Sequence, residues 1–366
     1  WRAGIGNNAR MRVARPLIRR LLGAAGLAAS CAAGPAGALS FDYSFIAGTP
    51  VAAQNAFIAA GELWSSVLSD PITIRLTVGT AALGSGVLGQ ANTAQVVFSY
   101  STVRGALVAD ASSANDQLAV ASLPLGAVPL LINRTSQNSN SATAYLDNNA
   151  SDNNTFIEMS TANAAALGLP VNLGVLSGCL SQCDGYIRFN SSFNFDYDRS
   201  NGVTSNQFDF IGIAAHEIGH VLGFISGVDL LDGNPGASED QLRLMPLDLF
   251  RYSSASAAQG AVDFTASTTT KYFSINGGAA TTINFATGVA FGDGRQASHW
   301  KDGLGQVIMD PTSAPGEFLV IGPNDRTAFD VIGWNLTAVP EPGKPVLLAL
   351  GLAVLAIGIR RGRRAG

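Results

Sequence analysis

Charged side chains and histidines are scarce in this sequence. Charged residues make up 13% of its 366 residues, only three residues are histidine, and the formal net charge is −4. No run of lysine and arginine lies in the middle of the chain. Because nucleic-acid binding needs clustered cations to contact the phosphates, this lack argues against a nucleic-acid partner.

Cysteine is scarce as well, with three in the chain. Cys31 lies in a segment that we expect to be removed, which leaves Cys179 and Cys183. In an exported protein such a pair forms either a small disulfide loop or two free thiols. Alone, the pair is two ligands short of a structural zinc site.

Apolar residues are abundant by contrast. They make up 47% of the chain, which is not the composition of a disordered protein. Between the two ends lie about 300 residues, enough for one large domain or two small ones with a core.

Residues 1–38 have the features of a secretory signal peptide. We expect the natural chain to begin at Met11, after ten residues read from upstream. Arginines follow, then an apolar run over residues 21–33 and the small residues Ala36-Gly37-Ala38. This order matches an export signal with its cleavage site, and the run is too short to span a bilayer comfortably.

Residues 339–366 have three parts: Val339-Pro340-Glu341-Pro342, an apolar run over 346–359, and four arginines. Together they resemble the PEP-CTERM sorting signal of Gram-negative bacteria. The resemblance implies processing by an exosortase-type enzyme and delivery to the cell surface or outside. The run is a candidate transmembrane helix, although a short one, and an ordinary tail anchor is the alternative. We expect membrane contact only through these terminal segments.

Hydrophobic periodicity predicts several elements between the two ends. A helix is expected over residues 56–67 and a short closing helix over 325–333. Strands are expected over residues 72–78, 95–100 and 185–190. Residues 133–154, rich in Asn, Ser and Asp, are expected to form a loop. That loop could hold Ca²⁺, although its carboxylates fit no calcium-loop spacing.

The most informative segment is His216-Glu217-Ile218-Gly219-His220, an H-E-x-x-H motif within a helix expected over residues 208–224. Residues four apart on a helix project from the same face, so His216 and His220 can bind one Zn²⁺. Glu217 lies one step round the helix and can act as the general base that activates water. The alternative is a core helix whose histidines and glutamate bond one another.

A catalytic zinc site normally has a third protein ligand. His299 is the one remaining histidine and lies 79 residues after His220. We expect its ring nitrogen about 3–4 Å from those of His216 and His220. Glu239 and Asp229 are competing candidates, and a histidine that only stacks beside Trp300 is the alternative.

The segment from His216 to Phe224, with Gly223 after the second histidine, resembles the active helix of the metzincin proteases. Most metzincins place their third histidine where this chain has Ser226. The leishmanolysin-like branch instead has an insertion before a distant histidine and a Met-turn, and Ser298-His299-Trp300 followed by Met309-Asp310-Pro311 is similar to that arrangement. The resemblance implies that His299 is the third ligand, that Met309 lies beneath the metal, and that Gly223 turns the chain off the helix.

The same resemblance implies an α+β fold, with a mixed sheet and the active-site helix in an upper subdomain and an irregular lower subdomain. The upper subdomain would comprise residues 39–226 and the lower one residues 227–338. The edge strand that pairs with extended substrate would be formed by Tyr186, Ile187, Arg188 and Phe189. No tyrosine follows Met309 closely, so no oxyanion-stabilising side chain can be named.

Two functions agree with these features. The first is an exported zinc endopeptidase with a polypeptide substrate, and the second is a non-catalytic surface or matrix protein with a structural zinc site. The intact Glu217 favours the first, because a structural zinc site has no use for a general base.

Overall fold

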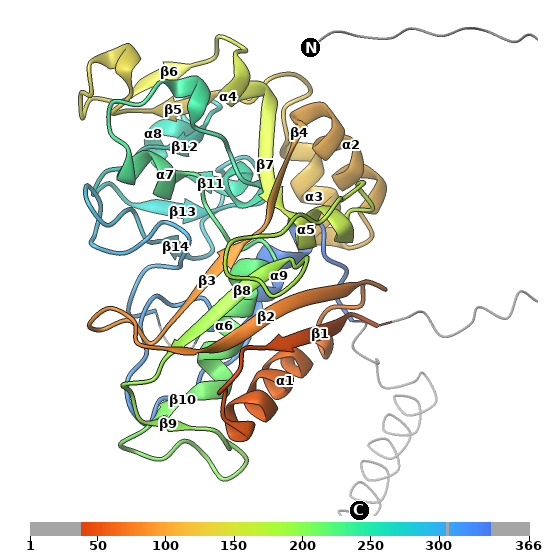
Figure 1. Ribbon diagram of the computed structural model, residues 1–366. Coiled ribbons are helices and arrows are strands. Elements are labelled where there is room, and N and C mark those ends of the chain that lie inside the picture. Colours follow the sequence, from red (N-terminus) through yellow and green to blue (C-terminus); the bar gives the residue numbers. More distant parts are fainter. Residues whose placement is uncertain (1–37, 305–306, 338–366) are drawn as a thin grey trace, which may run out of the picture. The chain divides into compact units, whose positions relative to one another are not determined.

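The computed structural model describes residues 38–304 and 307–337. In these residues the fold is mixed, with helices and several separate sheets (Figure 1), which confirms the α+β class. No helix among them is long and apolar enough to cross a membrane. The expected signal peptide, Cys31 and the expected sorting signal lie outside the described residues.

The main sheet has four strands in the order β1-β2-β8-β3. Strands β1 (Ser40–Phe45), β2 (Thr73–Ala81) and β8 (Gly185–Asn190) run parallel, and β3 (Gly89–Thr93) runs antiparallel to β8. The sheet is therefore mixed, as expected. Because β8 pairs with a strand on each side, the prediction that residues 186–189 form the edge strand is wrong, and β3 lies at the edge instead.

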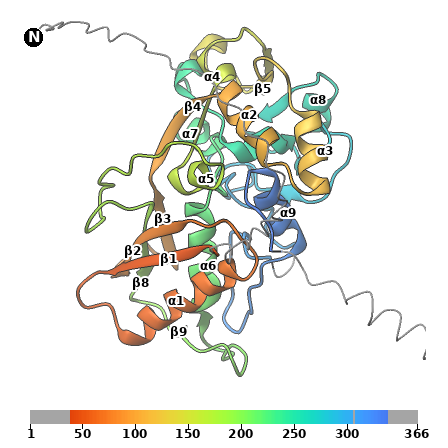
Figure 2. The same cartoon turned by 90° about the vertical axis from the view of Figure 1, so that its right-hand side faces the viewer.

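Helices α1 (Val51–Ser65) and α6 (Phe210–Val221) pack together against one face of this sheet (Figures 1 and 2). Between helices and sheet lies an aromatic cluster, in which the ring of Phe57 meets those of Phe189 and Phe210 edge-on at 5.3 and 5.2 Å. Trp64 donates its indole N–H to the carbonyl of Ala215 at 2.8 Å. These buried contacts fix α6, which carries the H-E-x-x-H motif, relative to the sheet.

The first half of the chain also contains two small strand pairs and several short helices. An antiparallel pair is formed by β4 (Gln95–Ser99) and β7 (Phe156–Ser160), and a parallel pair by β9 (Phe195–Asp196) and β10 (Phe208–Asp209). Four further helical segments are α2 (Tyr100–Asp110), α3 (Ala114–Ser122), α4 (Asp152–Thr155) and α5 (Thr161–Ala166). The closing helix expected over residues 325–333 is α9 (Pro323–Val331).

The remaining elements are short and come from both sides of α6 in the sequence. Strands β11 (Arg251–Tyr252), β13 (Lys271–Phe273) and β14 (Asn284–Phe285) make one sheet, and β12 (Val262–Phe264), β5 (Leu130–Ile132) and β6 (Tyr145–Asp147) make another. The helical turns are α7 (Val228–Gly233), α8 (Ser254–Ala257) and three 3₁₀ segments over Ser136–Asn138, Glu239–Gln241 and Pro246–Phe250. Since β5 precedes residue 226 and its partner β12 follows it, one sheet crosses the predicted subdomain boundary.

Several expected elements are found with shifted ends. The first helix begins at Val51 rather than at residue 56, and β4 ends at Ser99, whose hydroxyl caps α2 by accepting the backbone N–H of Thr102. The stretch 133–154, expected to be loop, contains β6 and a 3₁₀ turn. Its buried Asp147 accepts hydrogen bonds from side-chain amides of this stretch, so the calcium hypothesis gains no support there and stays a prediction.

The cysteine question is resolved by the structure. Cys179 and Cys183 form a disulfide, with their Cα atoms 6.3 Å apart. The bridge closes a short loop immediately before β8, so the disulfide interpretation is confirmed over two free thiols.

Candidate metal centre and active site

Helix α6 is capped at both ends by local interactions. At its start, the carboxylate of Asp209 accepts the backbone N–H of Gly212 at 2.9 Å. At its end, Gly223 has a φ of 116°, and the N–H groups of Gly223 and Phe224 donate to the carbonyls of His220 and Gly219. This paired pattern is a Schellman motif, which favours glycine at its left-handed position. The expected sharp turn at Gly223 is therefore found.

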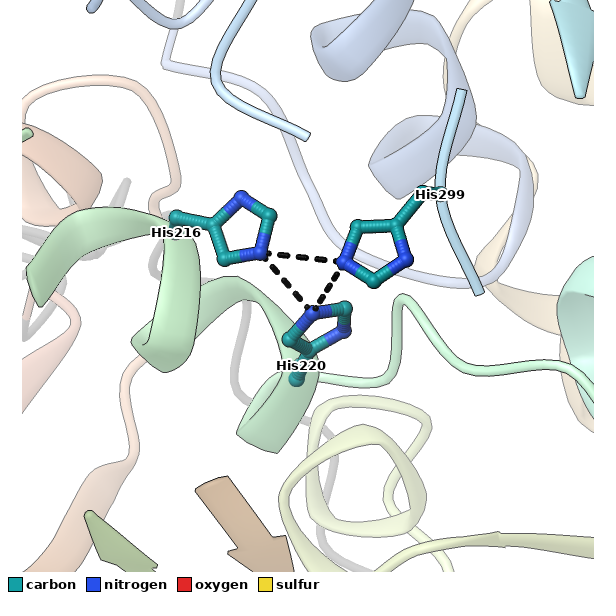
Figure 3. A group of neighbouring side chains, drawn as sticks. All are labelled: His216, His220 and His299. Carbon is teal, nitrogen blue, oxygen red and sulfur yellow. Dashed lines mark hydrogen bonds between the residues drawn. The ribbon is translucent and has the colours of Figure 1, made fainter. Parts of the chain in front are cut away.

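The three histidines of the chain converge on one point. His216 and His220 project from the same face of α6, and His299 approaches from the segment before the Met309 turn (Figure 3). The Nε2 atoms are 3.1 Å apart for His216 and His220, and 3.2 Å apart for each of these with His299. The expected separations of about 3–4 Å are thus found, and these residues form the one metal-ligand group identified among the described residues.

Backbone carbonyls determine which nitrogen of each ring carries the proton. The Nδ1 atoms of His216, His220 and His299 lie 2.7, 2.8 and 3.2 Å from the carbonyl oxygens of Ile308, Phe224 and Gln296. A carbonyl can only accept a hydrogen bond, so each Nδ1 donates and each neutral ring leaves Nε2 without a proton. Three lone pairs therefore face one another, an arrangement that a cation would stabilise.

Burial keeps these rings neutral. It lowers the pKa of His216 to about 3 and that of His220 to about 4, and it lowers the pKa of His299 as well. The three unprotonated Nε2 atoms would hold a metal ion where the rings border the cavity. Three imidazoles suit zinc, copper, iron or nickel, and the geometry by itself does not select one of them.

Glu217 lines the same cavity as the three rings. The cavity holds about 580 Å³ and is bordered by β3 on one side and by residues 310–313 on another. Burial raises the pKa of the Glu217 carboxyl to about 8. A Cβ placed on Gly89 of β3 would come within 2.9 Å of its Oε1, so the edge strand passes directly beside the carboxyl group.

Met309 lies against α6 at the position of Gly219. A Cβ placed on Gly219 would come within 2.6 Å of the Met309 sulfur, and the Met309 side chain is fully buried. The carbonyl of Met309 accepts the N–H of Trp300 at 3.0 Å, which joins the turn to the segment that carries His299. A glycine at 219 thus leaves room for Met309 against the helix that carries the motif, and the expected place of Met309 beneath a metal stays a prediction.

The competing third ligands lie elsewhere. Glu239 accepts hydrogen bonds from the Tyr145 hydroxyl at 2.5 Å and the Asn149 amide at 2.9 Å. Asp229 accepts from the backbone N–H groups of Ala297 and Ser298 at 2.6 and 3.0 Å. Neither carboxylate belongs to the histidine cluster.

The predicted substrate strand is separated from this cavity by β3. Ile187 and Phe189 are buried in the core, whereas Tyr186 and Arg188 line a second hollow of about 630 Å³ near the disulfide loop. The cavity beside Glu217 is instead lined by residues 86–91 and Thr93. The sequence Gly-Gln-Ala-Asn-Thr of β3 alternates small residues with amides, but it has no large apolar or aromatic side chain, so its strand signal is weak.

Comparison with protein-family models, with curated proteins and with solved structures returned no match for this chain. The functional interpretation therefore depends on the motif residues and on the geometry described above.

Proposed function

We propose that this protein is an exported zinc-dependent endopeptidase of the metzincin type, similar to the leishmanolysin-like branch. The observation that carries the proposal is the position of Glu217. It shares one open cavity with three neutral imidazoles whose unprotonated nitrogens converge. Three protein ligands, an open side and an adjacent carboxylate are the features of a catalytic zinc site.

The donor set fits zinc. Bound there, zinc would lower the pKa of water at its open position and polarise a peptide carbonyl. His216, His220 and His299 would hold the ion through Nε2, each oriented by a backbone carbonyl. Glu217 would take a proton from the attacking water and deliver it to the leaving amine, a task for which a carboxylate kept ionised by the neighbouring cation is suited.

Strand β3 takes the substrate role expected earlier for residues 186–189. It is the edge strand of the sheet and lines the cavity beside Glu217. An extended peptide can pair with an exposed strand edge through main-chain hydrogen bonds, which favours polypeptide over a small substrate. Such pairing would hold a peptide bond across the histidine cluster.

A non-catalytic protein with a structural zinc site is the second possibility that the sequence leaves open. Structural zinc sites are closed by four protein ligands. Only three ligand residues converge in the described part of this chain, and they border a cavity rather than packed side chains. This openness favours the catalytic proposal.

Export is part of the proposal. The expected signal peptide and PEP-CTERM segment would send the chain through the inner membrane of a Gram-negative bacterium, with an exosortase-type enzyme as processing partner. The disulfide between Cys179 and Cys183 agrees with an oxidising compartment. We therefore place the folded domain outside the cell or at its surface.

Replacing Glu217 tests the chemistry separately from metal binding. Glu217→Ala should keep one zinc per chain and lose casein cleavage by at least about 100-fold, because the base is removed and the ligands remain. Glu62→Ala, on the sheet-covering helix α1, is the control and should keep both properties. A Glu217→Ala protein that cleaves casein at the wild-type rate would exclude this mechanism.

A further inference from the structure

His299 lies in a segment with exposed residues on both sides. Residues 293–296 before it and 301–304 after it are exposed, whereas residues 297–300 are buried. The ring nitrogen nevertheless lies 3.2 Å from those of His216 and His220, which belong to a well-packed helix. Something must therefore fix the backbone of this segment relative to α6.

Backbone hydrogen bonds from Ala286 to His299 and from Trp300 to Met309 hold His299 and the residue after it, and a buried carboxylate holds the residues before it. Asp229 lies in the first turn of α7, close after the end of α6. Its Oδ1 accepts the N–H of Ala297 at 2.6 Å, and its Oδ2 accepts the N–H of Ser298 at 3.0 Å. Oδ2 also accepts the Ser298 hydroxyl in a very short hydrogen bond. One carboxylate thus holds the two residues that precede His299.

The chain leaving α6 contacts the same point a second time. The N–H of Ser226 donates to the Ser298 hydroxyl oxygen at 2.9 Å, so that hydroxyl accepts from Ser226 and donates to Asp229. Ser226 is itself fixed, because its hydroxyl donates to Asp248 at 2.5 Å. Ser226 occupies the position at which most metzincins carry their third histidine, and here that position anchors the segment with the distant His299.

We propose that Asp229, acting through Ser298, is a positioning residue that holds His299 in the geometry required for metal binding. The proposal rests on the proposed function, since it assumes that the histidine cluster binds zinc. A carboxylate can satisfy all three donors of residues 297 and 298 at once, whereas an amide would present an N–H to one of them. Holding the third ligand in place before metal binds lowers the entropy lost on binding.

The same helix provides a matched control. Asp232 is also buried on α7, and it accepts the backbone N–H groups of Ala290 and Phe291 at 2.7 and 2.9 Å. It therefore fixes an earlier part of the same connection without contacting the residues next to His299. Each substitution disturbs a carboxylate that accepts two backbone N–H groups, and only Asp229→Asn disturbs the residues next to His299, including the Ser298 hydroxyl.

The experiment compares zinc affinities of the wild type, Asp229→Asn, Asp232→Asn and Ser298→Ala by competition with a chromophoric chelator. Disturbing groups that orient a metal ligand typically weakens binding 10–100-fold. We expect a loss of about that size for Asp229→Asn and Ser298→Ala, and little change for Asp232→Asn. The intensity of the Co²⁺ absorption bands should fall in the first two variants alone, because one nitrogen ligand is displaced. The midpoint temperature of thermal unfolding, measured without metal, should fall by similar amounts in Asp229→Asn and Asp232→Asn.

Equal zinc affinities for Asp229→Asn and Asp232→Asn would overturn the positioning role and leave the proposed function intact. Absence of zinc binding by the wild type would overturn the proposed function and this inference with it. If Asp229→Asn does not fold, Ser298→Ala decides the question, with Ser274→Ala as its control. Ser274 is buried as well, and its hydroxyl donates to the Asn276 side chain rather than to a group beside a histidine.

Discussion

Burial acts in opposite directions on the side chains of the candidate site. It lowers the pKa of His216 to about 3 and raises that of Glu217 to about 8, so both residues prefer their uncharged forms. A cation held by the imidazoles would reverse the balance at Glu217, because a nearby positive charge stabilises a carboxylate. The neutral rings are ready to bind metal without first losing protons.

The absence of a side chain at Gly89 leaves room for the carboxyl group of Glu217. In Gly89→Ala the new Cβ would lie 2.9 Å from Oε1 of Glu217 and displace it. We expect kcat on a peptide substrate to fall by about 10-fold, a part of what a general base contributes, with zinc content unchanged. Gly84→Ala is the control, since its Cβ would meet no atom closer than 3.7 Å. Equal kcat values for the two variants would contradict this role of Gly89.

Among the elements, α6 and β3 differ in how well the sequence predicts them. The motif lies within α6, and Gly223 follows the end of the helix in the same short stretch of sequence, so local patterns predict both the helix and its turn. Strand β3 forms because β8 offers it a partner, and its own residues give only a weak strand signal, without any large apolar side chain. Residues 185–190 do form the predicted strand, β8, but the edge position assigned to residues 186–189 was wrong, because tertiary pairing places β3 at the edge.

The turn at the end of α6 should be sensitive to its glycine. A side chain at the φ of 116° found for Gly223 is strained, and a left-handed conformation costs roughly 1–2 kcal/mol for other residues. Gly223→Ala should therefore lower the free energy of unfolding of the metal-free protein in urea by about that amount or more. It should also weaken zinc binding, because Phe224, which accepts the Nδ1–H of His220, is next in the chain.

Gly105, within α2, is the control for Gly223. A Cβ there would meet no atom within 4 Å, so Gly105→Ala should leave stability unchanged or raise it by up to about 1 kcal/mol. If Gly223→Ala were as stable as Gly105→Ala, the turn would not depend on glycine.

Over the whole molecule, the site depends on contacts between residues far apart in the sequence. His299 could be predicted as third ligand because no other histidine remains in the chain. Asp229 was a ligand candidate by proximity in sequence, but sequence cannot show that its carboxylate turns to the backbone of Ala297 and Ser298 instead. Contacts of this kind arise only when the segment after α6 folds back beside it.

The Asp248 carboxyl accepts hydrogen bonds from Ser226 and Gly227, which follow α6. It should make the free energy of unfolding depend on pH. Burial raises its pKa from 3.8 to about 6 in the folded protein. The folded state then binds more protons than the unfolded state between these values, so this group contributes stability below pH 3.8 that is lost as pH rises through about 6. Urea unfolding of the metal-free protein at several pH values should show this fall. In Asp248→Asn the free energy of unfolding should fall less steeply with rising pH. An unchanged slope would contradict the role given to the Asp248 carboxyl.

The central claim is that the three histidines hold a zinc ion on which peptidase activity depends. The most direct measurement removes metal with a chelator, then follows casein cleavage while zinc is added back in measured steps. We predict that cleavage stops on metal removal and returns fully at one zinc per chain, and that His299→Ala needs far more zinc to recover any activity. Cleavage that continues in the metal-free protein, or no cleavage by the fully zinc-loaded wild type, would contradict the claim.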